Sequence, residues 1–339
     1  MARLSNFLRR QNGAAENSPA NSSAGRDCRL VQRHEIDQAL RVLLSSGSGL
    51  AGDEQVLDFL SYAIHRNVDV NATWIATMRG RIEWSILPVI SPGKTMLMLS
   101  PTQLFRHTPA EAVSAISQAI CLEYAQRDIH LAQLLLDPDH RAVRDAYLAS
   151  GFTELAELVY LRRAVRSSME APALPPQYEL RSYSPECEQQ FLDAIRSTYE
   201  NSLDCPGLNG IREMRDVFDG HRATGEFSPH LWHIVVEQDH PRAVLLLNRS
   251  VHSDAMELVY IGISPAARGK GLGDALMRLA MHLTARDGKA ELTLAVDSRN
   301  VPAMKLYFRH GMKRIGSRTA LIQDLRPLRA AVGSVPVAG

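Results

Sequence analysis

The sequence has no run of apolar residues long enough to cross a membrane. Its longest apolar runs are short, as in residues 243–247, whereas a bilayer-spanning helix needs about 18 consecutive apolar residues. The N-terminal region has no apolar core followed by a small-residue cleavage site, so it does not predict a secretory signal. Residues 1–27 are rich in Asn, Ser, Ala and Gly and predict a disordered leader, with an organellar transit peptide as the alternative because Arg3, Arg9 and Arg10 are basic. We expect no membrane partner.

Cysteine is scarce and scattered. The four cysteines, Cys28, Cys121, Cys187 and Cys205, form no C-x-x-C pair, so neither a zinc knuckle nor a dithiol redox site is predicted. No histidine stands at metal-ligand spacing from cysteine or acidic clusters, and we expect no metal. Scattered cysteines are typical of a reducing compartment, which favours a cytoplasmic location.

An excess of charge of either sign is also missing. Lys and Arg together number 38, against 37 for Asp and Glu, which gives a net charge of +1. This balance excludes a strongly basic nucleic-acid coat and an acidic tail protein. We therefore expect no nucleic-acid partner, although a local basic patch is compatible with the balance.

The length of 339 residues indicates about two domains, at ~150 residues per domain. Residues 167–178 read SSMEAPALPPQY, and their prolines predict an extended linker. The expected boundaries are a first domain over residues 28–166, a second over residues 179–327 and a flexible tail over residues 328–339.

The two halves share a pattern of residues. Three pairs of identical residues are each separated by 160 positions: Asp137 and Asp297, Tyr147 and Tyr307, and Gly151 and Gly311. Upstream, the dipeptide Ser264-Pro265 stands 164 positions after Ser100-Pro101. Two copies of one unit predict a tandem arrangement of the same fold rather than a solenoid.

The second half alternates between strand and helix patterns. Strands are expected at residues 178–183, 232–237, 243–248, 256–263 and 291–296, and helices at residues 186–199, 211–221, 272–286 and 301–310, with a turn at residues 204–207. We predict an α/β (mixed α+β) fold with two tandem domains, each a twisted mixed sheet flanked by helices. The order of strand, glycine loop and helix predicts a ligand at the C-terminal end of the 256–263 strand.

The glycine loop at residues 268–273 joins that strand to the next helix. Its alternating glycines let the backbone approach a ligand closely, and the free N–H groups at the helix start point outward with the positive end of the helix dipole behind them. Arg268 and Lys270 add positive charge. The spacing fits neither a P-loop nor a Rossmann fingerprint. The loop alone therefore leaves two interpretations, a pyrophosphate cradle and a turn without a ligand.

Residues 268–273 and 300–312 together resemble two motifs of the GNAT superfamily of acetyl-CoA-dependent N-acetyltransferases. The first segment is similar to the (Q/R)-x-x-G-x-(G/A) motif and the second to N-x-x-A-x-x-L-Y-x-x-x-G-F, with Met312 in place of the usual Phe. The resemblance covers residues 257–312 and implies acetyl-CoA as a co-substrate. A tandem chain with a degenerate first copy is similar to mycothiol synthase and its relatives.

The resemblance also implies a binding site. In the family two neighbouring strands splay apart, and the pantetheine arm pairs with the free strand edge. The matching positions here are Ile261 and Ile263, through their backbone. Asn300 would bond the pantetheine arm, while its ordinary role is that of a helix N-cap. The implied cofactor-binding residues are Ile261, Ile263, Arg268, Gly269, Lys270, Gly271, Leu272, Gly273 and Asn300.

Two residues are candidates for proton transfer. By strand alternation Glu257 shares a face with Val259, Ile261 and Ile263, and in several GNAT subfamilies a Glu at this place is the base, acting directly or through water. Tyr307 would protonate the departing thiolate of coenzyme A. The competing interpretations are an exposed glutamate at a strand end and a packed aromatic ring.

The first half lacks this chemistry. The positions that match the three loop glycines are Phe105, His107 and Pro109. Bulky side chains would block a pyrophosphate, and Pro109 has no N–H to donate. Gly93 and His140 stand opposite Glu257 and Asn300. We expect a degenerate GNAT-like domain without the acetyl-CoA motif.

The expected activity is acetyl-CoA-dependent N-acetylation, with direct transfer of the acetyl group to the primary amine of a small molecule. One alternative is a protein or peptide N-terminus as acceptor, and another is a non-catalytic acyl-CoA-binding module. An acetyl-enzyme at Cys205 would need a base beside the thiol, and no such partner is identifiable. The sequence does not predict the acceptor's identity or the oligomeric state.

Overall fold

The computed structural model describes residues 26–46, 49–104, 108–166, 171–251 and 253–333. These residues form two compact units. The first comprises the described parts of Met1–Ile90, Met96–Thr153 and Ile322–Gly339, and the second comprises those of Ser91–Thr95 and Glu154–Leu321. Within the described ranges, no helix combines the length and apolar character that a membrane crossing requires.

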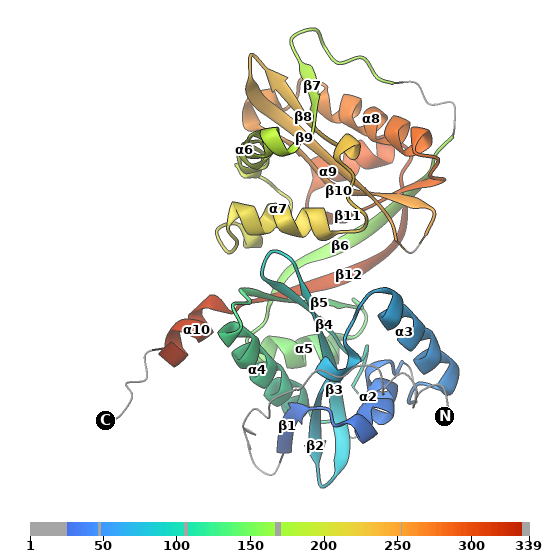
Figure 1. The fold of residues 1–339 in the computed structure, drawn as a ribbon, viewed down its shortest axis with the longest axis vertical. Helices are drawn as coiled ribbons and strands as arrows, with labels where there is room; N and C mark the ends of the chain where they lie inside the picture. Colours follow the sequence, from blue (N-terminus) through green and yellow to red (C-terminus); the bar gives the residue numbers. More distant parts are fainter. Residues whose placement is uncertain (1–25, 47–48, 105–107, 167–170, 252, 334–339) are drawn as a thin grey trace. The chain divides into compact units, whose positions relative to one another are not determined.

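The first unit is a sheet covered by helices on both faces (Figure 1). Its strands, in order across the sheet, are β1 (Arg26–Leu30), β2 (Trp74–Met78), β3 (Arg81–Ser91), β4 (Thr95–Leu99), β5 (Leu131–Leu136) and the end of β12 (Lys313–Asp324). Its helices are α2 (Ile36–Leu43), α3 (Asp53–His65), α4 (Ala110–Gln126), α5 (Arg141–Ala149) and α10 (Arg326–Gly333). On β3, Leu87 packs with α2 and α3, whereas Trp84 donates a hydrogen bond to Tyr147 of α5. Residues 84 and 87 point to opposite faces of the strand, so α2 and α3 lie on one face of the sheet and α5 lies on the other.

The second unit carries a mixed sheet. Its strand order is β12, β6 (Thr153–Ala164), β11 (Glu291–Asp297), β10 (Ala255–Ile263), β9 (His240–Arg249), β8 (Trp232–Glu237) and β7 (Glu179–Ser182). Its helices are α6 (Glu188–Tyr199), α7 (Met214–Ala223), α8 (Leu272–Arg286) and α9 (Val301–Arg309). β10 and β11 are parallel, while β6–β11, β9–β10, β8–β9 and β7–β8 are antiparallel. The α/β fold with helix-flanked mixed sheets is thus as the sequence predicts.

Two apolar clusters fix the helices of the second unit on its sheet. One contains α8 together with Met256, Leu258 and Leu292. The other contains α6 and α7 around Trp232, whose ring contacts Phe191, Phe218 and Phe227 at centroid distances of 6.4, 5.3 and 4.8 Å. Each helix buries the apolar stripe that its 3.6-residue period creates, which leaves the C-terminal end of β10 between the two helix layers.

Several boundaries differ from the sequence expectations. β6, the last strand of the first half, pairs with β11 along all seven residues of β11, so it lies in the second unit. Arg26 and Asp27, expected in the leader, lie in β1, where Arg26 forms an ion pair with Glu83 at 2.7 Å. Part of the expected tail is helix α10, held by an ion pair between Arg329 and Asp128. The rest of the leader (1–25), of the tail (334–339) and residues 167–170 of the linker lie outside the described residues.

A buried amide ties α7 to the sheet of the second unit. Trp232 Nε1 donates to Asn248 Oδ1 at 2.8 Å. Asn248 Nδ2 donates to the carbonyl oxygen of His221 at 2.9 Å and to that of Thr224. Asn248 is fully buried, so its replacement would leave the buried Trp232 Nε1 and the Thr224 carbonyl oxygen without these hydrogen bonds.

We expect Asn248→Ala to lower the free energy of unfolding by about 3 kcal/mol, because buried polar groups left without partners cost about 1–3 kcal/mol each. Urea denaturation followed by tryptophan fluorescence measures the loss. Asn209→Ala, at an exposed position, is the matched control and should change stability by less than about 0.5 kcal/mol. Equal midpoints for both variants would contradict the role given to Asn248.

Candidate functional site

β10 and β11 part after three residue pairs. Their parallel pairing covers only Ala255–Glu291, Met256–Leu292 and Glu257–Thr293. Beyond it, β11 stays paired with β6 as far as Asp297, and β10 stays paired with β9 as far as Ile263. From Leu258 onward the edge of β10 that faces β11 therefore has no strand partner among the described residues, and its backbone groups are available to a ligand.

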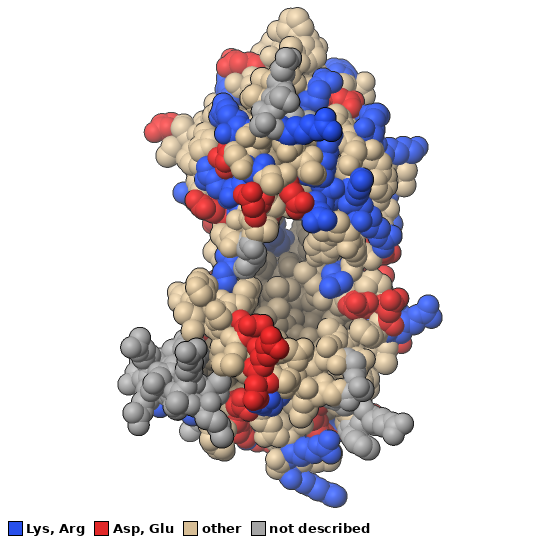
Figure 2. All heavy atoms as spheres, turned by 90° about the vertical axis from the view of Figure 1, so that its right-hand side faces the viewer, with Lys and Arg blue, Asp and Glu red and all other residues tan. Residues whose placement is uncertain are grey.

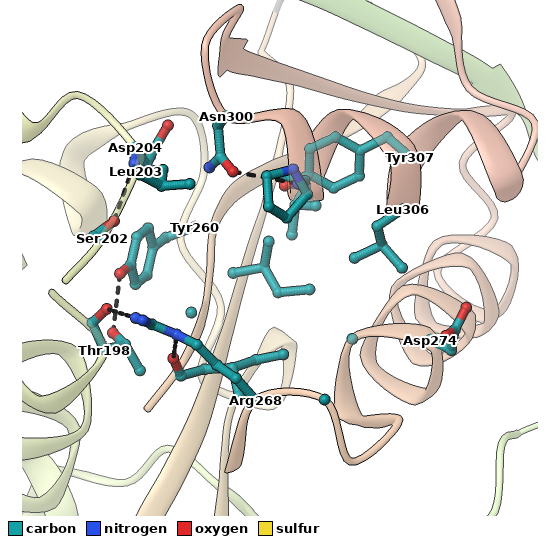
Figure 3. A pocket seen from close by; sticks show the side chains of 18 of the residues that line it. Thr198, Ser202, Leu203, Asp204, Tyr260, Arg268, Asp274, Asn300, Leu306 and Tyr307 are labelled. Atoms are coloured by element: carbon teal, nitrogen blue, oxygen red, sulfur yellow. Dashed lines mark hydrogen bonds between the residues drawn. The ribbon is translucent and has the colours of Figure 1, made fainter. Parts of the chain in front are cut away.

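A cavity of about 530 Å³ opens where the strands part. Its walls come from the end of α6 and the loop after it, from the splayed part of β10, from the glycine loop and from α9 (Figure 3). The predicted site residues that line it are Ile261, Ile263, Arg268, Gly269, Gly271, Gly273, Asn300 and Tyr307. Glu257, Lys270 and Leu272 are not among its lining residues.

The glycine loop presents free backbone to this cavity. Gly269 and Gly271 have φ values of +75° and +81°, a region that favours glycine. A Cβ added at either position would meet nothing within 4 Å. Gly271 is the N-cap of the 15-residue helix α8, so the N–H groups of its first turn lack helical partners. Leu272 is buried and anchors this turn in the core. These residues fit a diphosphate, the anion that a helix N-terminus and open glycines accommodate.

Arg268 is engaged by the protein itself. Its guanidinium donates to the carbonyl oxygens of Thr198, Glu200 and Asn201 at 3.4, 2.7 and 3.1 Å, and to that of Ile263 at 3.1 Å. The first three lie at the C-terminal end of α6, where carbonyl groups lack helical partners. The side chain thus fastens the glycine loop to α6, while its charge remains at this end of the cavity.

A β-bulge corrects the face assigned to Glu257. Leu258 pairs with Leu247 and Tyr260 with Leu246, so Val259 is an extra residue on β10. The alternation resets there. Ile261 and Ile263 pack on the α8 side together with Met256 and Leu258, and Glu257 falls on the opposite face. The expectation that Glu257, Ile261 and Ile263 share a face is therefore wrong, because no strand period survives an inserted residue.

Tyr307 lies on α9 with only 6% of its surface exposed, and its ring borders the cavity (Figure 3). Burial, followed by the nearby charge of Asp204, raises the pKa of its phenol. Asn300 is the N-cap of α9 and accepts from the Ala303 N–H at 3.3 Å, the ordinary role considered for it. It also lines the cavity.

The matching tyrosine of the first unit has different surroundings. The Tyr147 hydroxyl donates to Ser100 Oγ at 2.6 Å and accepts from Trp84 Nε1 at 3.4 Å. The side chain is fully buried, which raises its pKa to about 12. Helix α4 starts after Pro109, while Phe105 and His107 lie outside the described residues. Tyr147 is thus a packed core residue.

Several residues that line the cavity are not among those that the sequence predicts. The loop after α6 contributes Ser202, Leu203 and Asp204, and β10 contributes Tyr260, whose hydroxyl lies 2.9 Å from Thr198 Oγ1. The predicted turn at residues 204–207 was the one available signal. Burial raises the pKa of the neighbouring Cys205 thiol to about 12, so this cysteine is not activated as a nucleophile.

A second, basic cavity of about 1,090 Å³ lies elsewhere in the second unit. Its basic lining residues are Arg162, Arg163, Arg166, Arg278, Lys313 and Arg314. Figure 2 shows Lys and Arg side chains gathering on one face of this unit. The net charge of +1 gives no indication of this local excess of basic residues. Among the described residues, no cluster of His, Cys, Asp and Glu could hold a metal ion.

Comparisons with known proteins find a family likeness within the second unit. Residues 195–312 match the Acetyltransferase (GNAT) family. A mycothiol acetyltransferase from Gordonia bronchialis is 28% identical over 181 residues, covering 48% of this chain and 54% of the relative. One from Mycolicibacterium gilvum is 32% identical over 191 residues, covering 53% and 59%. The chain thus matches between half and two thirds of the length of these relatives.

The fold likeness extends over both units. The crystal structure of a GCN5-related N-acetyltransferase from Sphaerobacter thermophilus covers 91% of this chain and 98% of its own, with a TM-score of 0.56 and 14% sequence identity. At this identity the likeness concerns the fold alone. Because the likeness covers 91% of the chain, it includes both units, as the repeated residue pattern predicts.

We expect Arg268→Met to lower the free energy of unfolding by about 1–2 kcal/mol, because several carbonyl groups lose a charged donor. Arg268→Lys should recover little of this loss, since an ammonium cannot reproduce the planar fork of donors. Thermal unfolding of both variants provides the measurement. A lysine variant as stable as the parent would show that charge alone matters at this position.

Proposed function

Because residues 195–312 belong to the GNAT acetyltransferase family, we propose that this chain is an acetyl-CoA-dependent N-acetyltransferase acting on the primary amine of a small molecule. The observation that carries the proposal is the cavity between the parted strands. It joins the glycine loop at one end to Tyr307 at the other. A pantetheine thioester needs such a continuous path from a diphosphate site to the reacting carbonyl.

The cofactor-binding roles follow from the exposed backbone. The N–H groups of Leu272 and Gly273 at the start of α8 would bind the diphosphate, with Gly269 and Gly271 leaving it room and Lys270 adding charge. The backbone of Ile261 and Ile263 would pair with the pantetheine arm as a neighbouring strand would. Asn300 would add a side-chain hydrogen bond to this arm.

The chemical step needs a polarised carbonyl, a neutral amine and an acid for the leaving group. The unpaired backbone of β10 around Val259 would polarise the thioester carbonyl. The amine nitrogen attacks the carbonyl carbon, the carbon–sulfur bond breaks, and Tyr307 gives its proton to the thiolate. The raised pKa of Tyr307 keeps the phenol protonated until then, and desolvation raises the pKa of the departing thiol in the same way. Glu257 would receive the amine's proton through water, because its side chain does not line the cavity.

The relatives' name supports a small-molecule acceptor, since the matched proteins are mycothiol acetyltransferases. Experiments can distinguish this function from two alternatives, a peptide acceptor and a non-catalytic module. A peptide acceptor would compete with small amines and would be acetylated at its N-terminus, which mass spectrometry detects. A non-catalytic module would bind coenzyme A tightly without releasing thiol from acetyl-CoA in the presence of any amine.

We expect Gly271→Ala to weaken acetyl-CoA binding at least tenfold, because a Cβ would enter the diphosphate site. Gly288→Ala is a matched control. Gly288 follows α8, has a φ of +75° and also has open space around its Cβ position. Both variants therefore bear a similar backbone strain, about 1 kcal/mol, and only the first should lose the acetyl-CoA-induced rise in melting temperature. Loss of that rise in both variants, or in neither, would count against the assignment of the loop.

We expect Tyr307→Phe to lower kcat by about 10²- to 10⁴-fold, the usual range for loss of a general acid, with acetyl-CoA binding unchanged. Thiol release measured over a panel of primary amines tests this, and Glu257→Gln in the same assay tests the water-mediated base. Full activity of the phenylalanine variant would remove Tyr307 from the chemistry. Unchanged rates in both variants together with absent turnover in the parent would favour the non-catalytic module.

A further inference from the structure

Asp204 lies on the loop that follows α6 and lines the cavity of the second unit. In Figure 3 it stands with Leu203 and Tyr260 on the side of the cavity across from Leu306. Its position is fixed by the backbone, since its N–H donates to Ser202 Oγ at 3.1 Å.

The same loop lies close to the end of β11. The backbone of Cys205 is near enough to the Asp297 carboxylate to lower its pKa, and Cys205 itself lies in the left-handed region with a φ of +44°. Asp204 is therefore presented to the cavity by a segment that lies next to the end of β11.

The two carboxylates differ in their charge partners. Asp297 is fully buried and is bound by Arg299 through two side-chain hydrogen bonds of 2.8 and 3.0 Å. These bonds outweigh the effect of burial and lower the pKa of Asp297. Asp204 forms no ion pair with a described residue. The residue is exposed, yet desolvation by the neighbouring protein and the charge of Asp297 raise the pKa of its carboxyl.

The cavity lining is therefore polarised. At the glycine loop, Arg268 contributes a positive charge that carbonyl groups hold in place. Asp274 and Arg309 neutralise each other, with a separation of 2.9 Å. The remaining charge is Asp204, close enough to Tyr307 to raise the pKa of its phenol. A ligand that is anionic at one end and cationic at the other complements this arrangement.

We propose that Asp204 binds the positively charged nitrogen of the acceptor and selects ammonium-bearing acceptors over neutral alcohols. This inference rests on the proposed function, since it concerns the acceptor end of the same cavity. Asp204 lines that cavity, whereas Glu257 does not. The ammonium recovers the charge partner that the carboxylate lacks within the protein, inside the cavity that Tyr307 also lines.

Calorimetry on the full chain saturated with coenzyme A tests the proposal. The probes are glucosamine and 1,4-diaminobutane, with glucose and 1,4-butanediol as their neutral counterparts. We expect Asp204→Asn to weaken binding of the tighter amine at least tenfold, and to change neither the neutral probes nor the affinity for coenzyme A. Asp204→Glu, which keeps the charge, should retain part of the amine affinity.

Glu213→Gln is the matched control. Glu213 precedes α7, is exposed and does not line this cavity, so its removal changes the net charge alone and should leave amine binding intact. Melting temperatures of all variants verify that they fold. Amine binding that is equal in the parent and in Asp204→Asn, including no binding by either, overturns the inference.

Turnover separates this inference from the proposed function. If the parent acetylates an amine and Asp204→Asn does so with an unchanged KM for the amine, the function stands and the role of Asp204 is wrong. If amine binding depends on Asp204 but no thiol is released from acetyl-CoA, the role of Asp204 stands and the catalysis is wrong.

Discussion

The parting of β10 and β11 is the constraint from which the site follows. Each strand keeps its outer neighbour, β9 or β6, while the inner pairing stops at Glu257 and Thr293. The gap is therefore bordered by two edges that are fixed elsewhere, and it does not close by relaxation of either strand. The bulge at Val259 contributes by twisting β10 at the point of divergence. A pocket built in this way exposes strand backbone groups to a ligand beside the side chains that line it.

The local features of this site could be predicted from the sequence, and the long-range ones could not. The glycine loop, the helix after it and the N-cap at Asn300 depend on a few neighbouring residues, and the structure has them where the sequence predicts. The bulge leaves no mark in the residues themselves, so strand alternation alone predicts the wrong face for Glu257. The carbonyl groups that engage Arg268 come from residues about 70 positions away. The placement of β6 beside β11 is likewise a long-range pairing that no local period reveals.

The two copies of the repeat show how surroundings decide the role of one residue type. Tyr147 and Tyr307 occupy matching helices and are both buried. In the first unit the hydroxyl has partners in Ser100 and Trp84 and is part of a packed interior. In the second the ring borders an open cavity with a carboxylate nearby. The same residue type thus packs in the interior of the first unit and borders a cavity in the second.

The hydrogen bonds of Arg268 connect the glycine loop rigidly to the end of α6, on the other side of the cavity. The guanidinium belongs to the glycine loop, and its acceptors at residues 198–201 lead directly into the segment that carries Asp204. Insertions or deletions before residue 201 would shift these carbonyl groups and disturb the glycine loop as well. Changes in length and chemistry are consequently easiest after residue 201, where the anchored helix end stays in place.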